Sequence, residues 1–161
     1  MRISLFLISF LLIFTTFTSC KTQKKQIKET QPTTLSDNLF LKMQRTPCYG
    51  KCPNYTLEIF ESGKVKYNGK MFVENIGEFE SVLSTTSIQT IKNKIKEINF
   101  FELNDKYDSP ATDIPATIFE VFENNQQKKI TNRHKSPESL KELEKLIEDI
   151  VYQSNLKPIN K

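Results

Sequence analysis

Cys48 and Cys52 are the residues of this chain whose type and spacing best fit a chemical role. They lie in the segment R-T-P-C-Y-G-K-C-P, residues 45–53. Three intervening residues, Gly50 among them, allow a turn tight enough for a disulfide, and the flanking prolines keep the segment out of a regular strand. In an oxidising compartment we expect the two thiols to join. Because the closed loop is so short, the bond would stabilise the fold by only about 2 kcal/mol and would mainly shape the turn.

Two other chemistries stay open for this pair. One is a thiol redox site, although the spacing is C-x3-C where the thioredoxin-type motif is C-x2-C at the start of a helix. The other is a metal site completed by His134, the single histidine of the chain, and an acid such as Asp113. His134 lies in the polar linker N-R-H-K, where a solvated loop residue is the simpler interpretation.

A second marked segment, N-D-K-Y-D-S-P-A-T-D-I-P at residues 104–115, concentrates acidic side chains and prolines. Asp105, Asp108 and Asp113 carry oxygens that suit calcium, but the spacing lacks the glycine turn and terminal glutamate of an EF-hand loop. Short acids in a turn usually cap backbone groups. We therefore expect a structural loop, with partner recognition as the functional alternative and with neither metal nor cofactor.

These two segments together form the predicted recognition surface. The sequence has no Ser/His/Asp order, no glycine-rich phosphate loop and no carboxylate pair with a partner base, so it predicts a protein that is not an enzyme. The candidate surface residues are Tyr49, Gly50, Lys51, Tyr55, Tyr107, Asp108, Thr112 and Asp113.

The third cysteine, Cys20, sets the expected compartment. It follows an apolar run from Ile3 to Thr18 that stands behind a single positive charge at Arg2 and ends in F-T-S-C. The apolar core of about a dozen residues is shorter than the roughly 20 that a spanning helix needs. We therefore expect a lipoprotein signal peptide at 1–19, cleavage before Cys20, and a lipid on that cysteine. Ordinary secretory cleavage and an uncleaved anchor are the alternatives.

The organisation of the rest follows from composition and charge. Residues 20–37 are rich in Lys, Gln and Thr without apolar periodicity, which predicts a flexible tether; residues 38–155 form one domain and 156–161 a tail. The formal charge is +4 and becomes +3 once Arg2 is removed, and the basic tether suits anionic lipid headgroups. Because the chain is exported and its other basic residues alternate with Glu, nucleic acid is not an expected partner. The sequence K-T-Q-K-K after Cys20 favours a periplasm-facing protein.

The periodicity of apolar residues predicts an α+β fold, an antiparallel sheet with two amphipathic helices on one face in the order β-ββ(β)-α-ββ-α. A first strand is expected at 39–45. Two hairpins are expected at 56–67 and 117–131, with turns at Ser62-Gly63 and Asn124-Asn125. After an Asn68-Gly69 turn we expect a further strand at 70–73 and another at 78–83. Helical spacing places Ile88, Ile91, Ile95 and Ile98 on one helix and Leu140, Leu143, Leu146, Ile147 and Ile150 on a second, with Ser136 as its N-cap.

The two hairpins are similar in sequence at an offset of 62 residues. T-L-E-I-F-E at 56–61 aligns with I-F-E-V-F-E at 118–123. Internal duplication predicts two ββα units related by a pseudo-two-fold axis, and chance similarity between amphipathic hairpins is the alternative.

The string R-T-P-C-Y-G-K-C-P-N-Y-T-L-E-I-F-E-S-G-K-V-K-Y-N-G, followed at a distance by T-D-I-P, resembles a family of Bacteroidota-type envelope lipoproteins, the domain of unknown function 6438. The resemblance covers most of residues 40–152, and its P-C-x-G-x-C-P-x-Y string is intact from Pro47 to Tyr55. It implies no known activity. More loosely, the hairpins and helices resemble protein-binding envelope modules of the PepSY and β-lactamase-inhibitor kind, at the level of fold alone.

Together these features predict a lipid-anchored periplasmic binding or interaction module without enzymatic activity, whose partner is an envelope protein or a glycan. An envelope thiol redox factor or enzyme using Cys48 and Cys52 is the first alternative. A structural envelope lipoprotein without a discrete ligand is the second.

Overall fold

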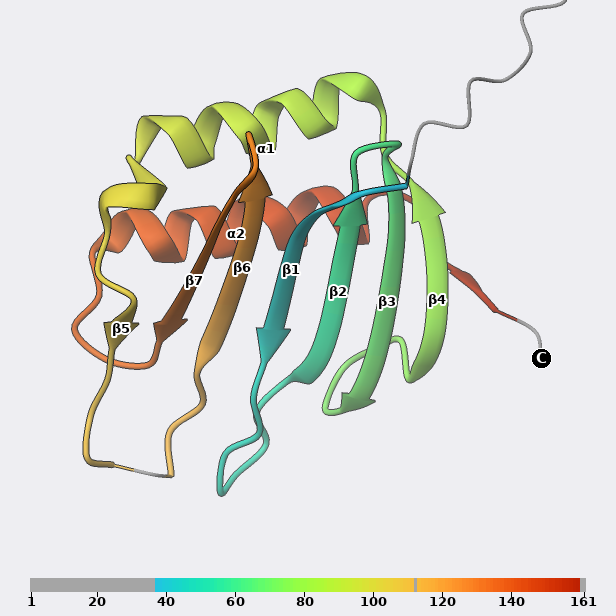
Figure 1. The fold of residues 1–161 in the computed structure, drawn as a ribbon. Coiled ribbons are helices and arrows are strands. Elements are labelled where there is room, and N and C mark those ends of the chain that lie inside the picture. Colours follow the sequence, from blue (N-terminus) through green and yellow to red (C-terminus); the bar gives the residue numbers. More distant parts are fainter. Residues whose placement is uncertain (1–36, 112, 160–161) are drawn as a thin grey trace, which may run out of the picture. The chain divides into compact units, whose positions relative to one another are not determined.

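The described part of the chain folds around one sheet. The computed structural model describes residues 37–111 and 113–159. Within them an eight-stranded mixed sheet, with strand order β5-β7-β6-β1-β2-β3-β4-β8, is covered on one face by the helices α1 and α2 (Figure 1). The predicted α+β class, with both helices on one face, is confirmed. The predicted signal peptide, the predicted lipidation site Cys20, most of the predicted tether and Thr112 lie outside the described residues.

The elements follow the predicted order, with short additions. The strands are β1 Leu39–Arg45, β2 Asn54–Phe60, β3 Lys64–Met71, β4 Gly77–Val82, β5 Lys106–Tyr107, β6 Thr117–Glu123, β7 Gln126–Asn132 and β8 Lys157–Pro158. The helices are α1 Thr85–Glu97, the short 3-10 helix η1 Phe100–Glu102, and α2 Glu138–Tyr152. Among the described residues no helix is both long and apolar enough to cross a membrane.

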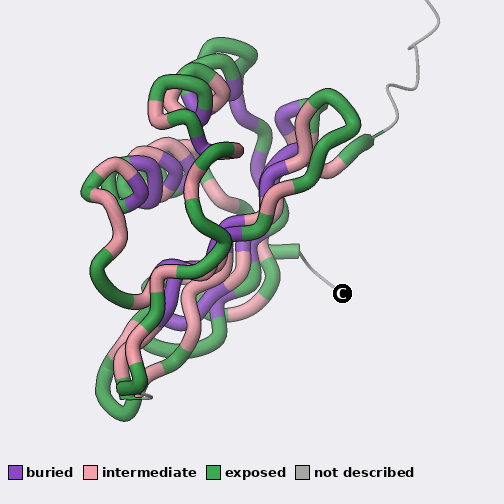
Figure 2. The backbone as a smooth tube through the Cα atoms, turned by 60° about the vertical axis from the view of Figure 1, so that its left-hand side comes forward, coloured by how far each residue is buried: buried purple, intermediate pink, exposed green. Residues whose placement is uncertain are grey.

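The core lies between the sheet and the two helices, as the colouring by burial shows (Figure 2). Alternate residues of the strands face the helices, as predicted from the period of two, except at an irregularity in β1 where the consecutive residues Phe40 and Leu41 are both buried. Each fully buried side chain of this kind stabilises the fold by about 1.5–3 kcal/mol relative to an exposed one. The sheet contributes Leu41, Met43, Tyr55, Leu57, Ile59, Val65, Tyr67, Phe119, Val121 and Ile130, and the helices contribute Ile88, Ile91, Ile95, Leu140, Leu143, Ile147 and Val151.

The central strand β1 pairs antiparallel with both predicted hairpins, with β2 on one side and β6 on the other. Met43 lies between Leu57 and Phe119, and Lys42 between Glu58 and Glu120, so residues 62 positions apart occupy the same level on either side of β1. The sequence similarity between the two hairpins therefore reflects the same pairing register of β2 and β6 with β1.

The predicted pseudo-two-fold axis is nevertheless wrong. β2 and β6 run in the same direction because each is antiparallel to β1, and β3 and β7 lie on their outer sides. A two-fold rotation that exchanged β2 and β6 without reversing them would turn the buried face of one hairpin to solvent. Both hairpins instead bury the same face of the sheet beneath the helices.

The open face of the sheet carries an alternating row of charges. Lys and Glu alternate at one level across seven strands, and Lys42 and Glu58 form an ion pair of 2.8 Å. Opposite charges on neighbouring strands stabilise the pairing and keep this face compatible with water. From β7 to β8 the row is Lys129, Glu120, Lys42, Glu58, Lys66, Glu80 and Lys157.

The turns and caps agree with the sequence in part. Asn124 and Asn125 both have positive φ, as a tight hairpin turn of the I′ type requires. Ser84 caps α1, since its hydroxyl accepts a hydrogen bond from the Ser87 N–H at 3.1 Å. The predicted N-cap at Ser136 is wrong by one residue: Pro137 occupies that position, and its carbonyl accepts from the Leu140 N–H.

The predicted turn at Asn68-Gly69 and the strand at 70–73 are wrong, whereas the strand near 78–83 is present as β4. β3 continues through Gly69 to Met71, and the chain reverses at residues 72–76. Gly69 is needed for a different reason. A Cβ atom there would lie 1.8 Å from the Asn75 carbonyl oxygen, so glycine admits the close approach of the following turn.

Two further differences concern the edges of the sheet. β5 pairs parallel with β7, so the sheet is mixed where an antiparallel one was expected. Residues 156–159, predicted to be part of a tail, belong to the domain. Leu156 packs against the core, and β8 pairs with β4 at an edge where Pro158 is tolerated because edge strands need fewer N–H donors.

Gly69→Ala should destabilise the domain by about 1–3 kcal/mol, because the clash is with backbone that must move as a unit. Urea denaturation measures the change. Gly50→Ala is the matched control, since a Cβ there meets only the Cys48 Sγ at 3.8 Å and should change stability little. Equal stability of the two variants would contradict the close-approach explanation.

Candidate functional site: the loop edge and the basic cleft

Three connecting segments lie side by side where the strands end, at the lower side of the view in Figure 1. We call this the loop edge: residues 46–53, 72–76 and, apart from Thr112, 108–116. The first and third segments are joined by backbone, because the Thr46 N–H donates to the Ala116 carbonyl at 2.9 Å and the Tyr49 N–H to the Asp113 carbonyl at 3.4 Å. The second lies beside the first, since Asn54 pairs with Met71. The two segments singled out in the sequence are thus neighbours in space.

The turn at 46–53 is closed by the predicted disulfide. Cys48 and Cys52 are bonded, with their Cα atoms 5.7 Å apart, and the Gly50 N–H donates to the Cys48 Sγ at 3.2 Å. At the tip, Tyr49 is 97% exposed. The disulfide therefore presents an aromatic side chain on a short, covalently closed loop.

The segment 108–116 is held by Asp108. Its carboxylate pairs with Lys106 at 2.9 Å and with Arg133 at 3.2 Å, and it accepts a hydrogen bond from the Ser109 N–H at 2.8 Å. The bond from Lys106 is the main cause that lowers the pKa of Asp108, followed by the bond from the Ser109 N–H. Asp108 thus anchors the loop, in the structural role expected for a short acid in a turn.

The predicted recognition residues therefore divide by location. Tyr49, Gly50, Lys51 and Asp113 are exposed at the loop edge. Tyr107 is half-buried and Asp108 is exposed at its base, where the Tyr107 hydroxyl accepts from the Asn104 N–H.

Tyr55 does not belong to this surface, and its assignment to the recognition set is wrong. It lies on the helix-facing side of β2 with 1% of its surface exposed, because its position follows the same alternation as Leu57 and Ile59. Its ring stacks on Tyr67 with centroids 5.4 Å apart, and its hydroxyl donates to a carboxylate oxygen of Glu148 on α2.

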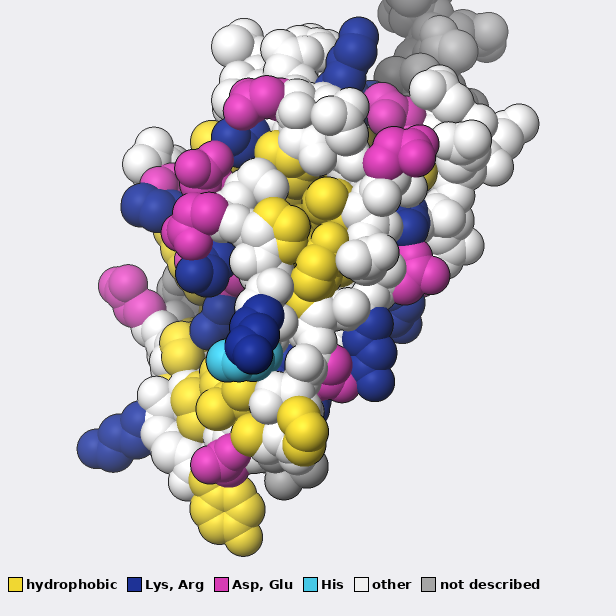
Figure 3. All heavy atoms as spheres, turned by 90° about the vertical axis from the view of Figure 1, so that its left-hand side faces the viewer, with side chains coloured by type: hydrophobic (Ala, Val, Ile, Leu, Met, Phe, Trp, Pro, Cys, Tyr) yellow, Lys and Arg dark blue, Asp and Glu magenta, His cyan; other side chains and the backbone are white. Residues whose placement is uncertain are grey.

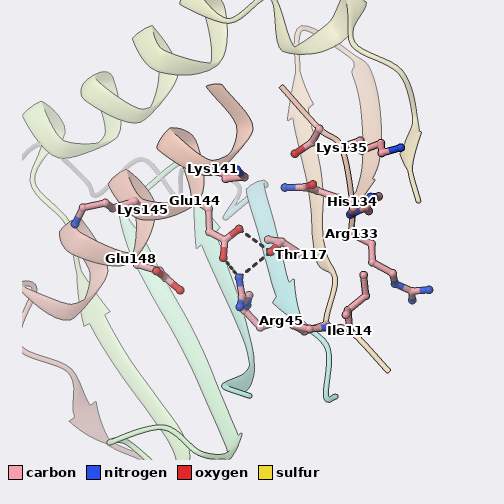
Figure 4. A pocket seen from close by; sticks show the side chains of 13 residues that line it. Arg45, Ile114, Thr117, Arg133, His134, Lys135, Lys141, Glu144, Lys145 and Glu148 are labelled. Carbon is pink, nitrogen blue, oxygen red and sulfur yellow. Dashed lines mark hydrogen bonds and ion pairs between the residues drawn. The ribbon is translucent and has the colours of Figure 1, made fainter. Parts of the chain in front are cut away.

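Beside the loop edge lies a cleft of about 620 Å³ between the sheet and α2, which we call the basic cleft (Figure 4). Its centre is an ion pair between Arg45, the last residue of β1, and Glu144 on α2. Thr117, the first residue of β6, completes the cluster: its hydroxyl donates to Glu144 at 2.6 Å and accepts from Arg45 Nη1 at 3.1 Å. The side chains of Arg45 and Glu144 are only 21% and 12% exposed.

The lining of the basic cleft is strongly cationic. Figure 3 faces this side of the molecule and shows a basic side chain directly over the histidine. Five Lys and Arg side chains and one His contribute, against two carboxylates. The lining residues are Arg45, Ile114, Pro115, Thr117, Asn132, Arg133, His134, Lys135, Ser136, Lys141, Glu144, Lys145 and Glu148.

The basic cleft was not predicted from the sequence, although one signal for it was present. Glu144 falls on the apolar stripe of α2, between Leu140, Leu143 and Ile147, where the helical period places core residues. A carboxylate on such a stripe needs a buried cationic partner, because an uncompensated buried charge is strongly unfavourable. The partner, Arg45, is 99 residues away in the chain, and local patterns do not identify it.

The alternative metal sites find no support in the geometry. Within the described ranges 37–111 and 113–159, no group of three or more His, Cys, Asp and Glu side chains is placed to hold a metal ion. Asp105 pairs with Lys128, Cys48 and Cys52 are used in the disulfide, and His134 lies at the cleft.

Comparison with known proteins identifies a family without a described activity. Residues 39–151 match the family model of a domain of unknown function, DUF6438, which spans more than half of the chain. No curated protein matches the chain.

The tyrosines beside the cleft should make the domain sensitive to alkaline pH. Burial, and secondly the hydrogen bond to Glu148, raises the pKa of Tyr55, and burial followed by the contact with Tyr152 raises the pKa of Tyr67. The unfolded chain loses these protons near pH 10, whereas the folded domain keeps them. Stability is therefore fully present below about pH 10 and should fall as the pH rises above it.

Urea denaturation between pH 8 and 11.5, with tyrosinate absorbance recorded in parallel, measures this effect. Tyr67→Phe should show a shallower decline than the parent chain, and Tyr49→Phe, which removes an exposed hydroxyl, serves as the control. The same slope in Tyr67→Phe and the parent chain would show that the buried hydroxyls are not responsible.

Proposed function

The chain belongs to the DUF6438 family, and from its geometry we propose that it is a non-enzymatic binding module held at the bacterial cell envelope by a lipid on Cys20. The loop edge is its partner-binding surface. The partner we propose is an envelope protein, and a glycan is the other outcome that the experiment below distinguishes.

The main observation behind this proposal is that the loop edge is both rigid and exposed. Tyr49 stands on a loop closed by a disulfide, and that loop is hydrogen-bonded to the neighbouring segment 108–116. Exposed aromatic side chains on rigid loops suit binding, because tyrosine offers a large contact area and little conformational entropy is lost when the loop is already ordered.

Further apolar side chains extend this surface towards β4. Met71, Phe72 and Ile76 are 45%, 51% and 58% exposed in and beside the turn 72–76. Phe72 has a positive φ of 55°, a conformation that bulky residues rarely adopt. Apolar surface that a fold exposes at such a turn is more useful to a partner than to the isolated domain.

The direction of β1 also supports this assignment. The chain enters the domain at the opposite edge, where Asp37 accepts from the Ser62 hydroxyl and the Asn38 carbonyl accepts from the Glu61 N–H. β1 then runs the length of the sheet for seven residues, roughly 23 Å at 3.3 Å per residue, and ends at the loop edge. A partner can therefore bind the loop edge without meeting the end to which the tether is attached.

Localisation and anchoring in this proposal rest on the sequence. The apolar segment before Cys20 and the basic residues Lys21, Lys24, Lys25 and Lys28 after it suit a lipid-anchored, periplasm-facing protein near anionic headgroups. An exported domain of this kind meets envelope proteins and glycans, and not nucleic acid.

A photo-crosslinking residue at exposed Lys51 should capture a discrete partner in intact cells. Tyr49→Ala should weaken that capture about tenfold or more, because loss of an aromatic hot spot typically lowers affinity by at least this factor. Val82→Ala is the matched control: Val82 is 72% exposed at the far end of β4, away from the loop edge. Mass spectrometry of the captured species separates a protein from a glycan.

Absence of any discrete species from position 51 would contradict the proposed surface. Capture of the same species from Lys129, on the open face of the sheet, would show that binding is not specific to the loop edge.

The disulfide should be structural rather than catalytic. The double variant Cys48→Ser/Cys52→Ser should remain folded, lose about 2 kcal/mol of stability or less, and retain a weakened crosslink, because the turn loses its covalent closure. Thermal unfolding and the position-51 crosslink measure the two effects. A variant that keeps its melting temperature and its crosslink but loses its cellular phenotype would favour the thiol redox function instead.

A further inference from the structure

The cations of the basic cleft are paired to different degrees. Arg45 pairs with Glu144 and Arg133 with Asp108, Lys141 and Lys145 pair with exposed carboxylates of α2, and Lys135 has no ion pair among the described residues. Both carboxylates of its lining are already engaged: Glu144 accepts from Arg45 and Thr117, and Glu148 accepts from the Tyr55 hydroxyl. The cationic side chains outnumber them. Ion pairs between exposed side chains are weak, so the lysines of the lining stay able to bind an added anion, and a concave site with low-dielectric walls focuses their positive potential.

Arg45 is held in a fixed orientation, and not all of its N–H donors are used in hydrogen bonds. Its hydrogen bonds to Glu144 and Thr117 both use Nη1, while Nε is buried without a hydrogen-bond partner among the residues that the structure describes. A guanidinium has five N–H donors in a fixed planar fork that matches a carboxylate or a phosphate. Glu144 and Thr117 therefore orient Arg45 without filling its capacity.

The start of α2 adds to the positive potential. Ser136 and Lys141 line the cleft on either side of the first turn, and no described side chain caps the helix at Pro137. The N-terminus of a helix carries a partial positive charge and unpaired N–H groups. Glu138 in the first turn offsets part of this, but its ion pair with Lys141 is solvent-exposed on both sides and therefore weak.

Residues 133–135 form one rim of the basic cleft, and backbone hydrogen bonds hold them in position. The N–H groups of Arg133 and His134 both donate to the Tyr107 carbonyl, at 2.8 and 3.2 Å. Lys135 follows with a positive φ of 54°. These contacts place the rim residues opposite α2, across a cleft whose volume of about 620 Å³ is in the range of small-molecule sites.

We propose that the basic cleft binds a small ligand through an oxyanionic group, a carboxylate or a phosphate. Arg45 provides the fixed donor at the floor, and Lys135, Lys141 and the start of α2 surround the anion. This site adjoins the loop edge at Ile114 and Pro115, but its anion donors lie on β1, residues 133–135 and α2, so either proposal can fail without the other.

Titration of the purified protein, with the Cys48–Cys52 disulfide formed, tests the site by amide chemical shifts in NMR spectra. The probes are inorganic phosphate and succinate, and sodium chloride at matched ionic strength is the baseline. We expect saturable shifts at residues 132–136 and 138–141 with at least one probe. The probe that saturates at the lower concentration identifies the preferred oxyanion.

Two variants make the test specific. Lys135→Gln/Lys141→Gln changes only exposed side chains and should weaken binding about tenfold, whereas Lys96→Gln, at an exposed position of α1 outside the cleft, should leave it unchanged. Arg45→Gln/Glu144→Gln removes the buried charges together and should abolish saturation while the domain stays folded. Absence of saturable shifts with both probes, or equal binding by the double-lysine variant and Lys96→Gln, would overturn the proposal.

Discussion

The largely buried ion pair between Arg45 and Glu144 is the constraint on which the arrangement of the two proposed functional surfaces depends. It joins the end of β1 to α2, and Thr117 brings the start of β6 into the same cluster. Removing one partner from a buried pair leaves an uncompensated charge, which typically costs about 3–5 kcal/mol, more than the pair itself contributes. The pair is therefore better understood as a device that specifies where α2 lies over the sheet than as a source of net stability.

The cluster of Arg45, Glu144 and Thr117 also connects the basic cleft to the loop edge. Arg45 is followed directly by Thr46, whose N–H and side-chain oxygen both bond to Ala116, so the strand end that orients the guanidinium also holds the segment 108–116. Asp108 secures the other end of that segment against Arg133, a residue of the cleft lining. The two surfaces thus share a rigid frame made of backbone bonds and half-buried ion pairs, while the side chains that face solvent remain free to contact other molecules.

Local patterns in the sequence predicted the elements well and the long-range contacts poorly, for physical reasons. Alternation in residues 39–45 and 117–123 and the spacing of the isoleucines in α1 follow from burial of one face, which each segment reveals alone. The continuation of β3 through Gly69 depends on the approach of Asn75, and the position of Pro158 depends on a free edge of β4. Tyr55 was assigned to the surface because its neighbours in the sequence form a motif, although its alternation with Leu57 already placed it in the core. The Arg45–Glu144 pair required knowledge of the tertiary structure.

The row of charges on the open face shows why charge alone does not mark a site. There each Lys has a Glu on the neighbouring strand at the same level, on a surface without concavity, so the field of each charge is cancelled by its neighbours and screened by water. In the basic cleft the carboxylates are used by internal hydrogen bonds, the cations come from three separate segments, and the surface is hollowed. The same residue types thus lie on a flat face where neighbouring strands cancel each charge, and in a hollow where Lys135 and the exposed lysines of α2 stand around an oriented Arg45. The proposed anion site rests on this second arrangement.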